Sequence, residues 1–336
     1  MKILKVIGII LAIVVVLAII LVIALPTKYN VERSVTIDAP KNIVFTQVAK
    51  FENFITWSPW TKLDPNMTYE ITGTDGEVGA AYSWSGNDSV GTGSLTTVAL
   101  TEDRIDQKLD FTSPWEAHDL AYYEFDDTPE GIKVTWGLDG NLARPMNLMG
   151  LFMSMEDMIG SDYEKGLESL KNQVASFVSN HTKRGYFINE VDLKPKFYVL
   201  KRESVKFSNI QEFYATNFQA IMQKIQLLEL PLAGAPSGLI YTWDMENNVA
   251  DMAAGIPIAE EADIDGFEVV ELSGKSLEIN YYGAYSGIAE AHYAMDDYMK
   301  ENGLALNEVV IEEYITDPSN EPDTSKWLTN VYYLVQ

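Results

Sequence analysis

VERSVTIDAPKNIVFTQVAKFENFITWSPW, residues 31–60, is the stretch that decides the fold of the first half of the chain. Residues 31–37 alternate between apolar and polar side chains, which is typical of a half-buried strand. Asp38 is suited to cap the N-terminus of a helix, and Pro40 favours its first turn. Apolar side chains within residues 43–48 supply the buried face of this helix. The stretch therefore predicts a strand followed directly by a helix.

The residues that follow predict a sheet and a long helix. Residues 51–60 are rich in aromatic side chains and are expected to form a turn region. Strand-like segments separated by Gly, Asn and Asp then occur at residues 67–73, 79–84, 91–100, 104–111, 119–125 and 132–138. Their spacing predicts an antiparallel sheet of hairpins. Residues 148–178 carry apolar side chains at helical spacing, and a long helix packed on a curved sheet would enclose an apolar cavity.

Residues 6–25, VIGIILAIVVVLAIILVIAL, form an uncharged apolar run ahead of the first strand. A helix of this length spans about 30 Å, the thickness of the hydrocarbon core of a bilayer. Lys2 and Lys5 favour a cytoplasmic N-terminus, so that everything after Pro26 would lie across the membrane. A cleaved signal peptide is the alternative, although the run exceeds the usual ~7–15 apolar residues of such peptides. We expect one uncleaved transmembrane anchor, since no later stretch is long and uncharged enough to span.

The composition excludes several functional classes. The chain has 336 residues, a formal net charge of −25 and no cysteine. Because nucleic-acid binding needs clustered Lys and Arg, this acidic chain is not expected to bind nucleic acid. Without cysteine there is no thiol nucleophile and no Cys-ligated metal site, and three widely spaced histidines do not predict a His-rich one. No metal or cofactor is expected. Setting aside Lys2 and Lys5 changes the charge from −25 to −27 for the remaining residues.

Residues 186–336 predict a different order of elements, in which a strand followed by a helix occurs twice. The pairs are expected at residues 197–205 and 210–227, and at residues 277–282 and 286–301. Strand-like segments follow each pair, at residues 239–243, 249–258, 308–315 and 327–335. Two such modules side by side predict an α+β domain with a pseudo-twofold axis and a groove where the sheets meet. With the polar residues 180–185 as a linker, the predicted domains are 1–26, 27–182 and 186–336.

The first half resembles the SRPBCC superfamily, which includes START, Bet v 1 and polyketide-cyclase-like proteins. The resemblance rests on APxxxVF and WSPW within residues 31–60, and on GEVGAAYSWSGN at 76–87, VTW at 134–136 and GSDYEKGLESLK at 160–171. It implies a helix-grip fold, in which the long helix closes a hydrophobic pocket. Trp84 and Trp136 are the candidate ligand contacts in this pocket. The alternative is that such tryptophans only pack against the sheet.

The second half resembles the GyrI-like effector-binding domain, which also occurs behind some transcription activators. YYGAY at residues 281–285, EEYITDP at 312–318 and WLTNVYY at 327–333 match its segments in order. The resemblance implies a pseudo-twofold groove for amphipathic, often cationic, small molecules, with Glu312 as its anionic floor. Tyr314 shares a strand face with Glu312, and a carboxylate flanked by aromatic rings binds a cation through charge and ring faces together.

The candidate ligand-binding residues of the second half are Glu312, Tyr285, Tyr332, Tyr282 and Tyr314. Tyr285 and Tyr332 are the preferred aromatic partners of Glu312. Two alternatives stay open: Glu312 is solvent-exposed on an edge strand, as most glutamates are, and the tyrosines pack in the core. No helix-turn-helix segment remains once both halves are assigned, so transcription control is not expected.

The leading hypothesis is a single-pass, membrane-anchored protein that binds or senses hydrophobic or amphipathic small molecules, cations among them. Its domains would lie at the periplasmic face of a bacterial inner membrane. The alternative is an enzyme, a hydrolase or cyclase acting on reactive small molecules, in which Glu312 is a general base and a pocket tyrosine assists. A third hypothesis is an interaction module of an envelope complex that binds no ligand.

Overall fold

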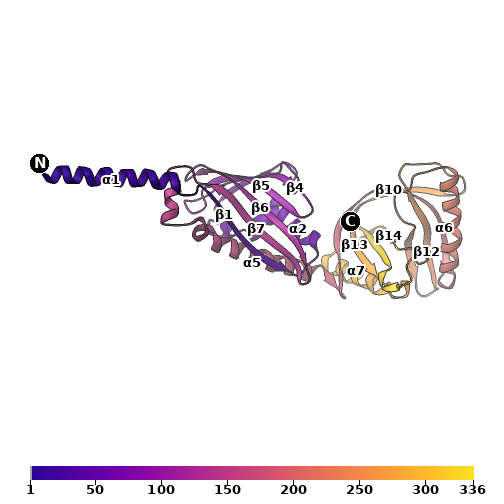
Figure 1. Cartoon of the computed structure of the whole chain (residues 1–336). Coiled ribbons are helices and arrows are strands. Elements are labelled where there is room, and N and C mark those ends of the chain that lie inside the picture. Colours follow the sequence, from indigo (N-terminus) through magenta and orange to yellow (C-terminus); the bar gives the residue numbers. More distant parts are fainter. Residues whose placement is uncertain (1) are drawn as a thin grey trace. The chain divides into compact units, whose positions relative to one another are not determined.

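The computed structural model describes residues 2–336, and the chain divides into two compact units on either side of the boundary between Val178 and Ser179. Helix α1 (Lys2–Ala24) belongs to the first unit and carries the apolar run (Figure 1). Within it, residues 5–24 are long and apolar enough to cross a membrane, with a mean hydropathy of 3.7 and no burial in the protein. A signal sequence has the same character, so the helix alone does not distinguish the two.

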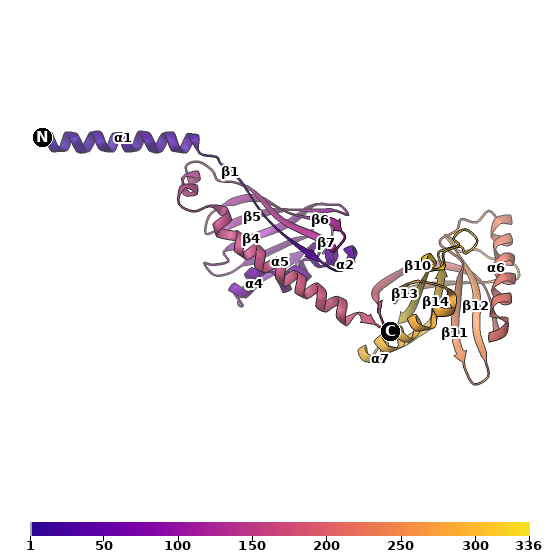
Figure 2. The same ribbon diagram turned by 60° about the horizontal axis from the view of Figure 1, so that its bottom comes forward.

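The first unit contains an antiparallel sheet in the strand order β1-β7-β6-β5-β4-β3-β2. The strands are β1 (Lys28–Ile37), β2 (Thr68–Thr72), β3 (Ala81–Ser85), β4 (Thr92–Leu100), β5 (Arg104–Ser113), β6 (Ala117–Thr128) and β7 (Gly131–Asn141). Helix α5 (Met155–Asn180) runs along one face of this curved sheet (Figure 2). This arrangement confirms the expected α+β fold with a long helix closing an antiparallel sheet.

The aromatic segment after the first strand is helical, which corrects the expected turn region. Helix α2 (Lys41–Ala49) is followed by α3 (Phe51–Trp57) and α4 (Pro59–Leu63). The carboxylate of Asp75 accepts hydrogen bonds from the backbone N–H groups of Phe51 (2.7 Å) and Glu52 (3.0 Å), so it caps α3 from a distant loop. A cap supplied from so far along the chain leaves no signal in the local sequence.

The long helix begins at Met155 and not at residue 148, which is a second correction. Residues 146–151 form the short 3₁₀ helix η1 (Met146–Leu151) instead. Ser154 and Asp157 exchange hydrogen bonds: the Ser154 backbone N–H donates to Oδ2 of Asp157 (3.2 Å), and the Asp157 N–H donates to Oγ of Ser154 (3.1 Å). This reciprocal pattern is that of a capping box, and it fixes the start of α5.

The second unit is built on a closed barrel in the order β10-β12-β11-β14-β15-β13. Its strands are β10 (Asn189–Lys206), β11 (Ser237–Asp244), β12 (Val249–Ile258), β13 (Glu268–Tyr282), β14 (Leu306–Tyr314) and β15 (Leu328–Val335). Its helices are α6 (Ile210–Leu227) and α7 (Ala289–Asn302), with short 3₁₀ turns η2 (Phe207–Asn209), η3 (Tyr285–Gly287) and η4 (Thr324–Lys326). The two expected strand–helix modules are present, but their strands close into one barrel. The short strand β8 (Thr182–Lys183), in the expected linker, pairs with β9 (Tyr186–Phe187) at the start of the second expected domain.

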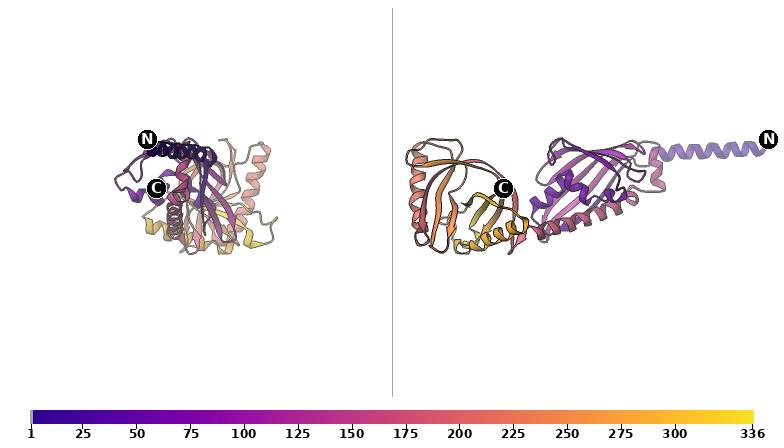
Figure 3. Two further views of the ribbon diagram at one scale, coloured as in Figure 1. Left: turned by 60° about the vertical axis from the view of Figure 1, so that its left-hand side comes forward. Right: turned by 180° about the vertical axis from the view of Figure 1, so that it is seen from behind.

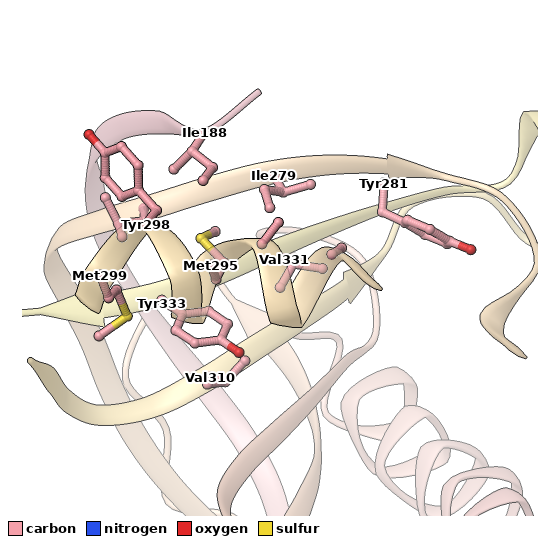
Figure 4. Packing of buried hydrophobic residues seen from close by; sticks show 12 residues of the cluster. Ile188, Ile279, Tyr281, Met295, Tyr298, Met299, Val310, Val331 and Tyr333 are labelled. Carbon is pink, nitrogen blue, oxygen red and sulfur yellow. The ribbon is translucent and has the colours of Figure 1, made fainter. Parts of the chain in front are cut away.

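Both helices of the second unit pack on the outside of the barrel. Residues of α6 share a hydrophobic core with β10 and β12, whereas α7 packs on β13, β15 and one residue of β14. Figure 4 shows Met295 and Met299 of α7 on the side of Ile279 and Val331. A third cluster, drawn from all six strands and no helix, fills the barrel interior. The outer face of β11 and β14 therefore lies between the regions covered by the two helices.

Gly166→Ala is expected to destabilise the first unit, although alanine favours helices. A Cβ at residue 166 of α5 would lie 2.7 Å from Cζ3 of Trp136 and 3.1 Å from Cδ of Pro59, and both rings are buried. Overpacking costs about 1–3 kcal/mol, against a gain of about 1 kcal/mol in helix propensity. Urea unfolding of the full chain, followed by tryptophan fluorescence, should therefore show a lower midpoint for this unit.

Gly160→Ala in the same helix is the matched control. The atom nearest to its Cβ, at 2.5 Å, is Nη2 of Arg33, the end of a flexible and partly exposed side chain that can move away. This substitution should leave the urea midpoint unchanged or raise it, because it adds up to about 1 kcal/mol to the free energy of unfolding. Equal stabilisation by both alanines would contradict the close packing of α5 on Trp136.

Candidate functional site

The first unit encloses a cavity of about 760 Å³ between α5 and the sheet. Both candidate tryptophans of this half, Trp84 and Trp136, line it and are buried. Trp136 stacks on Tyr163 of α5, with ring centroids 4.0 Å apart, and on Tyr123 of β6, at 5.4 Å. These tryptophans therefore both line the cavity and pack in the core. The volume lies within the range of small-molecule sites, about 300–1,000 Å³.

Apart from its tyrosines, the titratable groups that line this cavity are mainly acidic. Tyr29 donates a hydrogen bond of 2.8 Å to Oδ2 of Asp119, and burial raises the pKa of the Asp119 carboxyl. The other titratable carboxyl groups and the histidine that line the cavity are Asp88, Glu116, Asp162 and His118. No lysine or arginine is among the described lining residues. Within residues 2–336 the buried Nε1–H of Trp136 has no hydrogen-bond partner, so it remains available to an occupant.

Glu312 of the second unit lies on the outward face of β14. Strand alternation directs its neighbours Ile311 and Glu313 into the barrel, where Ile311 joins the interior cluster. Glu313 is 4% exposed and accepts hydrogen bonds from Nζ of Lys196 (3.2 Å) and the backbone N–H of Ala235 (3.3 Å). Opposite Glu312 on β11 is Gly238, where a side chain would collide with the hydroxyl groups of Tyr214 and Tyr314.

The carboxylate of Glu312 is held by two side chains from different elements. Nε2 of His292, on α7, lies 2.9 Å from Oε1, and the Tyr314 hydroxyl donates a 2.8 Å hydrogen bond to Oε2. Nδ1 of His292 lies 3.0 Å from the hydroxyl of Tyr333 on β15. A neutral imidazole satisfies both contacts when Nε2–H donates to Glu312 and Nδ1 accepts from Tyr333, an assignment made from the hydrogen-bond network.

The tyrosines around Glu312 keep their protons at neutral pH. Burial, together with the charge of Glu312, raises the pKa of Tyr314 well above its ordinary value. Burial also raises the pKa of Tyr333, with the charges of Asp296 and Glu312 adding to it. These hydroxyl groups therefore act as donors: Tyr314 donates to Glu312, and Tyr333 donates to Nδ1 of His292, whose Nε2–H donates to Glu312. Its side chain is only 12% exposed.

Aromatic rings border this carboxylate. The ring of Tyr285, in η3, lies edge-to-face with Tyr314 at a centroid distance of 5.4 Å and contacts Trp327 at 5.3 Å. On the other side, Tyr214 and Phe218 of α6 contact Tyr314 at 5.9 and 6.2 Å. Tyr285 is 37% exposed, so part of its surface is open to a ligand. A carboxylate beside exposed and buried ring faces suits an organic cation.

The structure brings three of the five candidate residues of this half together: Glu312, Tyr314 and Tyr285. Tyr332 lies on the other face of β15, in the barrel interior, because it is out of phase with Val331 and Tyr333. Figure 4 shows Tyr333, its neighbour, beside Val310 of β14. Tyr282 is 62% exposed at the end of β13, and no contact with Glu312 is recorded for it.

Sequence reasoning missed His292 and Tyr333 as members of the site. A signal for His292 was present in the helical spacing, since it shares one face of α7 with Met295 and Met299, which both belong to the core cluster. Tyr281 begins the YYGAY segment but is not one of the candidate ligand-binding residues. It is buried, and its hydroxyl donates to the Ala284 carbonyl at 2.7 Å, close to where a side chain on Gly283 would lie. It therefore shapes the YYGAY segment that presents Tyr285.

Comparison with known proteins assigns the two halves to families. Residues 28–175 match the family model for polyketide cyclase/dehydrase and lipid transport proteins, and residues 187–336 match that of the GyrI-like small molecule binding domain. No curated protein sequence matches the chain. Within residues 2–336, no group of three or more His, Asp or Glu side chains is arranged to hold a metal ion.

Solved structures with similarity to parts of the chain include the C-terminal domain of EcmrR. It is 16% identical, with 45% of this chain and 98% of that domain covered and a TM-score of 0.41. A hydrolase from Listeria innocua is 14% identical, with coverages of 44% and 91% and a TM-score of 0.31. The Aha1 dimer from Colwellia psychrerythraea is 15% identical, with coverages of 44% and 96% and a TM-score of 0.32.

The family matches confirm the order of domains that the sequence motifs predicted. Both families are described by the small molecules that they bind or process. The chain thus consists of a polyketide cyclase-like, lipid-transport-type domain followed by a GyrI-like small-molecule-binding domain, behind an N-terminal apolar helix.

Proposed function

We propose that this chain is a membrane-anchored receptor for lipophilic small molecules, and that its GyrI-like domain binds organic cations at Glu312. The observation that carries the proposal is the Glu312 carboxylate, which accepts hydrogen bonds from His292 and Tyr314 and is bordered by the ring of Tyr285. The two hydrogen bonds fix the carboxylate in place, so that it need not reorganise when a cation arrives. The remaining lone pairs and the partly exposed Tyr285 ring supply the attraction.

The anchor is the second part of the proposal. The apolar helix of residues 5–24 is uncharged after Lys5 and has no burial within the protein, as expected for a lipid-facing span. Lys2 and Lys5 favour a cytoplasmic N-terminus, which would put both domains on the periplasmic side of a bacterial inner membrane. Positively charged ligands entering the periplasm would then meet a strongly acidic protein surface.

Glu312→Gln should weaken the binding of tetraphenylphosphonium, used here as a probe cation. The substitution keeps the shape and the acceptor oxygen but removes the charge, and interactions with a charged partner contribute about 1.5–3 kcal/mol, equivalent to roughly tenfold to a hundredfold in Kd. Binding is measured by equilibrium dialysis with full-chain protein in phosphatidylcholine nanodiscs, after subtraction of empty nanodiscs.

Glu308→Gln is the matched control, because it removes one negative charge from an exposed position on the same strand. It should leave the affinity within about twofold of the wild type, since exposed charges contribute little. The neutral probe triphenylphosphine oxide should bind both variants and the wild type alike. Equal loss of the cation in both variants would mean that the overall acidic field, and not the Glu312 site, attracts the probe.

The anchor is tested on the protein made in a Gram-negative host. Because the apolar run is longer than a signal-peptide core, the membrane fraction should retain the protein after alkaline carbonate extraction. Its intact mass should include residues 1–26, and protease added to spheroplasts should digest both domains. A soluble protein whose mass lacks the apolar run would identify that run as a cleaved signal peptide.

Hydrolysis is a second candidate function, favoured by the contact of Glu312 with two proton-donating groups, His292 and Tyr314. In this reading Glu312 takes a proton from water as the water attacks an electrophilic ligand, and the partly exposed Tyr285 donates a hydrogen bond to the developing negative charge. Turnover of a reactive ester that is lost in Glu312→Gln, with binding of the neutral probe retained, would favour hydrolysis over binding alone.

A further inference from the structure

The cavity of the helix-grip domain has an apolar rim exposed to the surroundings. We use "apolar rim" for these exposed side chains near its mouth: Trp115, Met146, Met149, Leu151, Phe152 and Met153. Phe152 is the most exposed among them, at 90%. Four of them, Trp115, Met146, Met149 and Met153, also line the cavity, so the rim and the interior are continuous. Contiguous exposed apolar groups of this kind mark an interaction surface.

The apolar rim is fixed to the end of the apolar helix. Nε of Arg144 donates to the Val22 carbonyl at 2.9 Å, and Nη2 donates to the Ile23 carbonyl at 3.2 Å. Nδ2 of the buried Asn147 donates to the carbonyls of Val22 (2.9 Å) and Leu25 (3.2 Å). The Val22 and Ile23 carbonyls belong to the last turn of α1, which a helix cannot satisfy by itself, and Leu25 directly follows the helix.

This contact places η1 beside the C-terminal end of α1, as the views from the front and from behind both show (Figures 1 and 3). The apolar run of α1 is about as long as the hydrocarbon core is thick. If α1 spans the membrane, its end lies at the bilayer surface. The rim residues 146–153, two to nine residues beyond Arg144, lie there too, and Trp115 lines the same cavity as Met146, Met149 and Met153. Trp115 and the flexible methionines are suited to this boundary.

We propose that the apolar rim enters the outer leaflet of the bilayer beside α1, and that the cavity takes its ligand directly from the lipid. The ligand class is a neutral or cationic lipophile, because the cavity walls carry carboxyl groups and no lysine or arginine among the described residues. The free Nε1–H of Trp136 offers a hydrogen bond to a polar group of this ligand. The inference rests on the proposed membrane anchor but not on cation binding at Glu312.

The absence of cysteine allows a clean test by site-specific labelling. Phe152→Cys in the full chain is labelled with a nitrobenzoxadiazole fluorophore and reconstituted in phosphatidylcholine vesicles. The fluorophore should show blue-shifted emission and quenching by doxyl-labelled lipid. Val78→Cys, at a 61% exposed residue of the same unit that does not line the cavity, is the matched control and should show neither effect.

The outcomes separate this proposal from that of the anchor. Val14→Cys, in the middle of α1, must be quenched by doxyl lipid if the helix spans the bilayer. Quenching at residue 14 with none at residue 152 would overturn the rim proposal alone. No quenching at residue 14 would contradict the proposed membrane anchor as well. Blue-shifted emission at residue 152 without lipid quenching would mean that protein, for instance a second copy of the chain, covers the rim, and would also overturn the proposal.

Uptake of ligand gives an independent measurement. A fluorescent monoacylglycerol in doxyl-containing vesicles should become partly unquenched when the full-chain protein withdraws it into the cavity. The double substitution Leu151→Asp with Phe152→Asp changes two exposed rim residues that do not line the cavity. It should slow this recovery about tenfold, because carboxylates are disfavoured in the bilayer, while Val78→Asp should not. Binding of tetraphenylphosphonium should stay unchanged in both variants. Equal rates of recovery in the two variants would overturn direct uptake from the bilayer.

Discussion

The alternation of side chains along a strand is the constraint on which both candidate sites depend. In β14 it directs Glu313 into the barrel, where Lys196 and the Ala235 N–H satisfy it, and Glu312 outward to His292 and Tyr314. A shift of one residue in register would exchange the two carboxylates. Glu312 would then face the barrel interior, and the proposed cation site would lose its charge. The pairing of Glu312 with Gly238 and Val331 therefore determines which of the two carboxylates faces outward.

Much of the fold could be predicted from periodicity, because hydrophobic side chains recur on the face that is buried. Where prediction failed, the missing information lay elsewhere in the chain. Residues 51–57 form a helix whose N-terminus is capped by Asp75, and no local pattern reports that contact. The start of α5 was placed too early because residues 148–151 continue the apolar spacing, while the Ser154–Asp157 capping interaction sets the true beginning.

The candidate site was predictable only in part, because its contacts also join residues that are far apart in the sequence. The motif pointed to Glu312, and strand alternation added Tyr314. Choosing between Tyr332 and Tyr333 required the register of β15 against α7, because the two residues point to opposite sides of the barrel wall. His292 reaches Glu312 from a helix, so their contact depends on how α7 packs on the sheet. Spacing along the helix predicts an inward-facing histidine but not the partner that it meets.

Charge provides a common principle for the two domains. The residues after the apolar run carry a charge of −27, which alone is consistent with simple solubility. In each domain, however, an acidic group lies where a ligand would be held: Asp119 in the cavity and Glu312 beside Tyr285. An acidic surface concentrates cations near it, and the carboxyl groups within the sites then disfavour anions at close range. Under the proposed function, the acidic surface and the carboxyl groups within the sites select for the same sign of ligand charge.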